Sequence, residues 1–143
     1  MNEGAKRIKK PHCFLVYAIA PEGFTAGEAN QILNEFIAQP SLPLALYHDH
    51  FIGQPGGIAI FFVETPRERD ALLAQKYLDG WKVEYQPLIF SYSPAAFDER
   101  IAFTLKAYRG VEWERLRKVQ RPFYGNPNLE VETAQEDESP NGI

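Results

Sequence analysis

The chain has 143 residues, of which 45% are hydrophobic and 24% are charged, as is typical of one globular domain and not of a disordered chain. The single cysteine, Cys13, excludes an intramolecular disulfide and any metal site built on several cysteines. It also fits a reducing compartment. Because no apolar run approaches the roughly 18 residues of a transmembrane helix, we expect a cytoplasmic protein with no membrane partner.

The net charge of −4 is unevenly distributed along the chain. Residues 1–10 carry +3 and residues 11–99 carry −7, whereas residues 100–128 carry +5 and residues 129–143 carry −5. We therefore expect a flexible basic arm over residues 1–11 and a disordered acidic tail over residues 125–143. The acidic middle argues against a wholly basic nucleic-acid binder.

The first predicted elements are a strand, a helix and a second strand. Residues 12–20 are β-branched and aromatic and end at a Pro-Glu-Gly turn, as expected of a buried strand. Thr25 and Glu28 have the spacing of a capping box, and apolar residues follow at helical spacing as far as position 37. Pro40 and Pro43 mark the exit of this helix, and residues 44–52 are predicted as the second strand.

The second set of elements repeats this arrangement. The glycine-rich turn at 53–57 predicts a hairpin to a third strand over residues 58–63. Thr65, Pro66 and Glu68 give a second helix start, and Asp79-Gly80 gives its end. Residues 81–92 are predicted as the fourth strand. A last amphipathic helix is expected over residues 95–109, and it can resume after Gly110 as far as position 119.

The polarity of the strands predicts their order in the sheet. The first and third strands are apolar on both faces, which is typical of central strands. The second strand contains three polar residues in a row, and the fourth alternates in polarity and contains Pro87, so both belong at the edges. This pattern predicts an α+β domain over residues 12–92 with the ferredoxin-like βαββαβ arrangement and an antiparallel sheet of order 4-1-3-2. The C-terminal helix over residues 93–124 is expected to pack on this domain or on a partner.

The second face of this sheet needs a cover of its own. The two helices of the βαββαβ unit shield one face, but the central strands are apolar on the other face too. The candidate covers are the apolar stripe of the C-terminal helix (Phe97, Ile101, Leu105 and Tyr108) and a second subunit. We favour a combination of the two covers, with a homodimer, because a large exposed apolar patch is rare on a monomer.

Two histidines form the most chemically suggestive pattern. On a strand, His48 and His50 point the same way and could offer two imidazoles to a metal or to proton transfer. A catalytic zinc usually needs a third protein ligand, yet Asp49 points to the opposite face and His12 lies far away. We therefore predict no metal site. Cys13 is expected to be an inert core thiol, and no motif identifies a catalytic residue or a cofactor.

A cationic stretch in the C-terminal helix is the remaining candidate site. Its simplest interpretation is a solvated face that pairs with nearby glutamates and the acidic tail. Polyanion binding is the alternative, through Arg109, Arg115, Arg117, Lys118 and Arg121. The third strand lacks the basic and stacking residues of RNA-recognition domains, so we do not expect a nucleic-acid partner.

Three functions stay open. The leading one is a dimeric small-ligand-binding or regulatory domain, whose pocket on the second sheet face is lined by Tyr17, His48, His50 and Tyr85. The second is a cofactor-independent enzyme of the dimeric α+β barrel type that uses one of these side chains as an acid or base. The third is an interaction module that binds protein or nucleic acid through the basic C-terminal helix. The first leads because the sequence offers no assembled catalytic set, and whether the protein is an enzyme stays undecided.

Overall fold

The computed structural model describes residues 11–118. The chain divides into two units, residues 1–101 and residues 102–143. Most of the predicted basic arm, the acidic tail and the helical region after residue 118 lie outside the described residues.

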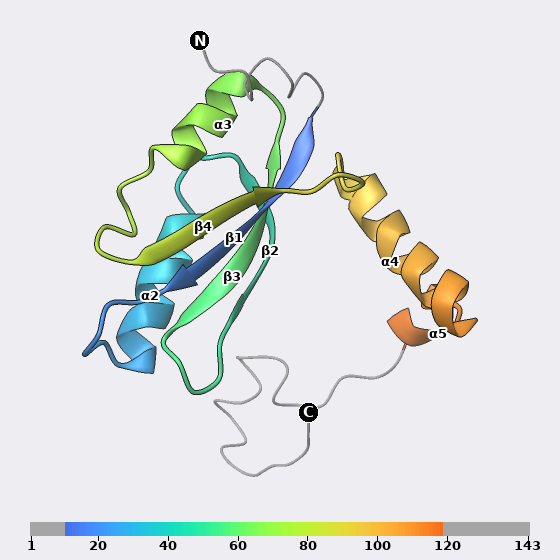
Figure 1. The fold of residues 1–143 in the computed structure, drawn as a ribbon, viewed down its shortest axis with the longest axis horizontal. Coiled ribbons are helices and arrows are strands. Elements are labelled where there is room, and N and C mark those ends of the chain that lie inside the picture. The colour runs from blue at the N-terminus through green and yellow to red at the C-terminus, as the bar shows by residue number, and fades with distance from the viewer. Residues whose placement is uncertain (1–10, 119–143) are drawn as a thin grey trace. The chain divides into compact units, whose positions relative to one another are not determined.

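The elements of the first unit follow the order βαββαβ (Figure 1). A further helix begins in the first unit and runs into the second, where a short helix follows it. The strands are β1 (His12–Ile19), β2 (Leu44–His50), β3 (Gly56–Val63) and β4 (Lys82–Pro87), and the helices are α2 (Ala26–Ile37), α3 (Pro66–Leu73), α4 (Pro94–Arg109) and α5 (Trp113–Arg117).

The four strands form one antiparallel sheet in the order β2-β3-β1-β4. This is the predicted 4-1-3-2 order counted from the other edge, so the α+β class and the strand order are confirmed. β1 and β3 pair along their whole length, from His12 opposite Val63 to Ile19 opposite Gly56. These two strands therefore form the centre of the sheet.

Two short sequence signals fix where the helices begin. The side chain of Thr25 accepts a hydrogen bond from the Glu28 backbone N–H, and Glu28 returns one to the backbone of Thr25, which completes the capping box. Thr65 caps α3 in the same way, through the backbone N–H of Glu68 at 3.1 Å. Both caps are the ones that the sequence predicts.

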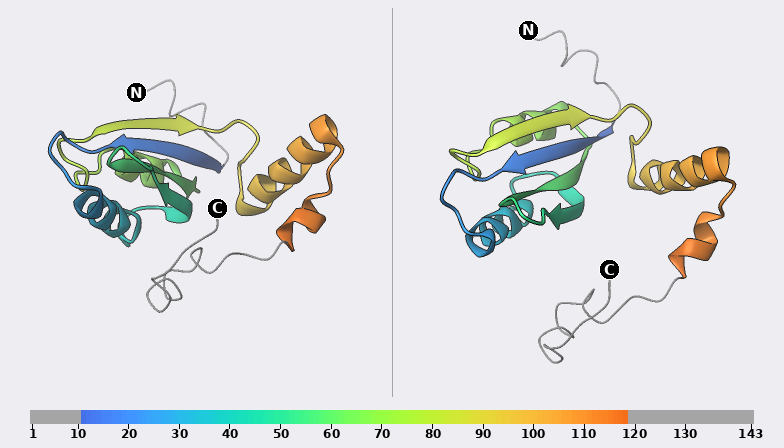
Figure 2. Two further views of the ribbon diagram at one scale, coloured as in Figure 1. Left: turned by 90° about the horizontal axis from the view of Figure 1, so that it is seen from below. Right: turned by 60° about the horizontal axis from the view of Figure 1, so that its bottom comes forward.

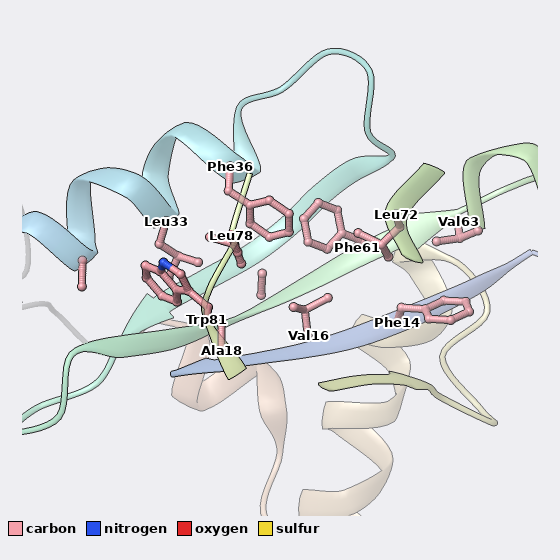
Figure 3. Packing of buried hydrophobic residues seen from close by; sticks show 12 residues of the cluster. Phe14, Val16, Ala18, Leu33, Phe36, Phe61, Val63, Leu72, Leu78 and Trp81 are labelled. Carbon is pink, nitrogen blue, oxygen red and sulfur yellow. The ribbon is translucent and has the colours of Figure 1, made fainter. Parts of the chain in front are cut away.

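The hydrophobic core lies between the sheet and α2 and α3, which cover the same face (Figure 2). Phe36 of α2 and Phe61 of β3 are fully buried and meet edge to face, with ring centroids 5.4 Å apart (Figure 3). Leu72 of α3 and Val16 of β1 extend this packing along the sheet. The side of the sheet that faces away from α2 and α3 is called the open face below.

Two elements are shorter than predicted. The fourth strand ends at Pro87 and not near residue 92. Leu88 still donates its N–H to the Cys13 carbonyl oxygen at 2.9 Å, but the Cys13 N–H bonds to the Ser91 carbonyl oxygen, so the regular pairing stops there. The helix α3 ends at Leu73 and not near Asp79. The side chain of Gln75 accepts a hydrogen bond from the Leu78 N–H at 3.0 Å, and this bond replaces another helical turn.

Gly57 gives a direct test of the packing between α2 and the β2–β3 pair. A Cβ at this position would overlap the backbone oxygen of Asp49 and a methyl group of Leu33. We expect Gly57→Ala to lower the free energy of unfolding by about 2 kcal/mol. The matched control is Gly27→Ala in α2, where the nearest atom is 4.0 Å away and helix propensity favours alanine by about 0.5 kcal/mol. Urea denaturation measures both variants, and a Gly57→Ala protein as stable as the wild type would contradict this packing.

Candidate functional site

Three of the four side chains predicted to line a pocket lie on the helix-covered face. Directly paired residues share a face of the sheet, and His48 pairs with Ala59 while Tyr85 pairs with Val16. Ala59 and Val16 belong to the core under the helices. His50, two residues after His48, lies on the same face. The histidines are on β2 and Tyr85 is on β4, which are opposite edges of the sheet.

The fourth side chain, Tyr17, lies on the open face. It pairs with Ile58 on one side and with Glu84 on the other. The structure therefore does not bring Tyr17 together with the two histidines. The hydroxyl of Tyr85 instead accepts a hydrogen bond from Gln75 at 2.9 Å, beside α3.

A β-bulge in β2 explains this division. The register between β2 and β3 shifts between Ala45 and Tyr47, so that Leu46 is the extra residue. Without the bulge, strict alternation from Ala45 would place His48 on the open face with Tyr17. With the bulge, His48 turns toward the helices, and Tyr47 turns to the open face. Nothing in the composition of the strand indicates this shift.

The register arranges the open face in rows that cross all four strands. One row consists of Asp49, Ile58, Tyr17 and Glu84, and the next consists of Tyr47, Ile60, Leu15 and Gln86. In each row the two central strands contribute mainly apolar side chains and the two outer strands contribute polar or amphipathic ones. The open face is thus an apolar strip between two polar margins.

Two tyrosines of the open face are exposed, one in the strip and one on its margin. Tyr17 is 44% exposed and Tyr47 is 47% exposed, whereas Ile60, opposite Tyr47, is buried. The ring of Phe51, which follows β2, lies 5.2 Å from the ring of Tyr17. The Tyr47 hydroxyl donates to the Asp49 carboxylate at 3.3 Å. Burial, then the Asp49 charge and this hydrogen bond, raise the pKa of Tyr47, so its phenol stays neutral.

One end of the open face is closed by the segment that follows β4. Cys13 donates its backbone N–H to the Ser91 carbonyl oxygen at 2.7 Å, and its Sγ lies 4.0 Å from the Ser93 carbonyl oxygen. The thiol is fully buried, and this burial raises the pKa of Cys13. A protonated, inaccessible thiol is a poor nucleophile, so Cys13 acts as a packing residue.

On the helix-covered side, the histidines form a small cluster with Asn34 of α2. The rings of His48 and His50 meet edge to face, with centroids 5.2 Å apart. His50 Nε2 lies 3.2 Å from Asn34 Oδ1, while His50 Nδ1 is buried and has no hydrogen-bond partner among the described residues. Burial first, and then the nearby His48, lower the pKa of His50, and the negative charge of Asp49 opposes them. His50 is therefore neutral at pH 7.

The basic residues of α4 and α5 are partly paired within their own segment. Lys106 forms an ion pair with Glu112, and Arg117 forms one with Glu114 at 2.9 Å. The guanidinium of Arg117 also lies 5.8 Å from the centre of the Trp113 ring. The other predicted polyanion-binding residues that are described are exposed: Arg109, Arg115 and Lys118. Arg121 lies outside the described residues.

The lowered pKa of His50 predicts how stability depends on pH. The unfolded chain binds a proton at the ordinary value of 6.5, but the folded chain binds it only at lower pH. The free energy of unfolding therefore falls as the pH drops below about 6.5 and levels off below the folded pKa. His50→Gln should flatten this fall, measured by urea denaturation at several pH values from 7.5 to 5. A fall in His50→Gln as steep as in the wild type would contradict the assignment to His50.

Residues 11–118 include no helix that is long and apolar enough to cross a membrane. In this part of the chain, no three side chains of His, Cys, Asp or Glu are grouped so that they could hold a metal ion. Comparisons of the chain with family models, with curated proteins and with solved structures found no match.

Proposed function

We propose that the protein is a small-ligand-binding or regulatory domain of the ferredoxin-like type, which acts as a homodimer packed through its open faces. The observation that carries this proposal is the polarity of the open face, an apolar strip on β1 and β3 between polar margins on β2 and β4. An apolar centre with a polar rim is the usual anatomy of a protein–protein interface.

The symmetry of this pattern favours a second copy as the partner. A two-fold interface uses the same patch on both subunits, so the patch must be complementary to itself. The outer strands are polar on this face apart from Leu44 at the start of β2, and the central strands are mainly apolar. A two-fold rotation therefore sets strip against strip and margin against margin. The exposed rings of Tyr17 and Tyr47 suit such an interface, since tyrosine gives a large apolar surface and keeps a polar end for hydrogen bonding.

A small ligand would lie between the two open faces. The hydroxyls of Tyr17 and Tyr47 and the side chains of Asp49, Glu84 and Gln86 are the polar groups that would orient it beside the apolar strip. His48 and His50 lie on the other face of the sheet, so the acid–base chemistry of an enzyme is not favoured in this position. The basic stretch is a weaker candidate because its Arg117, like the nearby Lys106, is paired with a glutamate close in sequence.

A charge placed in the strip tests the proposal. Tyr17→Asp should weaken the dimer by roughly 2 kcal/mol or more, since it would place a charge in the buried interface. That energy corresponds to about a 30-fold higher Kd. Analytical ultracentrifugation over a range of concentrations measures the equilibrium for the full chain, whose monomer mass is 16.3 kDa.

Leu73→Asp on α3 is the matched control, because Leu73 is 46% exposed and α3 covers the opposite face. This variant should dimerise like the wild type. A wild-type chain that stays monomeric at all concentrations, or a Leu73→Asp variant that dissociates as readily as Tyr17→Asp, would refute the proposed dimer. Thermal unfolding of both variants checks that each one folds.

A further inference from the structure

The two histidines on β2 lie close enough for their imidazoles to share one metal ion. His48 and His50 point to the same face of one strand, and their ring planes are nearly perpendicular, at 86°. Their centroids are 5.2 Å apart. An imidazole nitrogen binds zinc at about 2 Å, which places each ring centre roughly 3 Å from the ion. Two rings at a tetrahedral angle then have centres roughly 5 Å apart, so the observed spacing fits a shared ion.

The surroundings of His50 add a second, independent observation. Its Nε2 lies 3.2 Å from Asn34 Oδ1, so this nitrogen carries the proton and donates it to the amide oxygen. The lone pair therefore stays on Nδ1, which is buried and has no partner among the described residues. Burying an acceptor without a partner costs free energy. A metal-binding histidine typically donates its second ring N–H to an oxygen in this way, which fixes its tautomer and orientation.

Contrary to the expectation from the sequence, we propose that His48 and His50 bind one divalent late transition-metal ion, with Asn34 orienting His50 as a positioning residue. Imidazole suits zinc, copper and nickel, and is less suited to magnesium or calcium, which prefer oxygen ligands. No third His, Cys, Asp or Glu joins the pair within residues 11–118. Two protein ligands are fewer than a structural or catalytic zinc site usually has, so we expect weak binding.

Zinc titration of the full chain tests this site. Isothermal titration calorimetry with zinc chloride at pH 7.5 should show binding that weakens roughly tenfold or more in His48→Gln and in His50→Gln, because each removes one of two protein ligands. Asn34→Ala should weaken binding less than either histidine change. His12→Gln is the matched control and should bind like the wild type. Magnesium chloride should give no binding at these histidines.

A measurement on the wild type keeps the test independent of any loss of folding in the variants. In NMR spectra, zinc should shift the ring carbon-bound protons of His48 and His50 together and leave those of His12 in place. The proposal is overturned if these two histidines do not shift, or if only one does. It is also overturned if His48→Gln and His50→Gln, both folded, bind zinc as tightly as the wild type.

Discussion

The pairing of β1 with β3 in the centre of the sheet is the constraint on which the rest of the structure depends. The two strands align over their full length, and their side chains are apolar on both faces. On one face, Val16 and Phe61 pack under α2 and α3 in a close-packed core. On the other face, Leu15 and Ile58 form the strip that the proposed dimer would bury. Each Å² of apolar surface that the dimer removes from water there stabilises the dimer by about 25 cal/mol, before the costs of association are subtracted.

The same apolar character made the fold class and strand order predictable from the sequence. Whether a strand is apolar on both faces depends only on its own residues, so this property can be recognised without knowing any contact. The helix starts at Thr25 and Thr65 were equally predictable, because a capping residue acts within one turn. The ends of α3 and β4 were not, because they depend on the hydrogen bond from Leu78 to Gln75 and on the one from Cys13 to Ser91.

The candidate site was predictable only in part. Alternation alone places His48 and His50 on one face of β2, and the structure shows the same arrangement. Which face they take depends on the bulge between Ala45 and Tyr47, which no residue type in the strand reveals. The predicted lining therefore combined Tyr17 with histidines that lie on the other side of the sheet. Tyr47, which the bulge brings to the open face, was missed for the same reason.

The proposed dimer is most directly tested by isotope-filtered NMR on a one-to-one mixture of labelled and unlabelled chains, in which only contacts between copies give cross-peaks. Our account predicts cross-peaks from the ring of Tyr17 in one copy to the apolar side chains of the partner's open face. The absence of such peaks at concentrations where the chain is dimeric, or cross-peaks confined to the outer surfaces of α2 and α3, would contradict it.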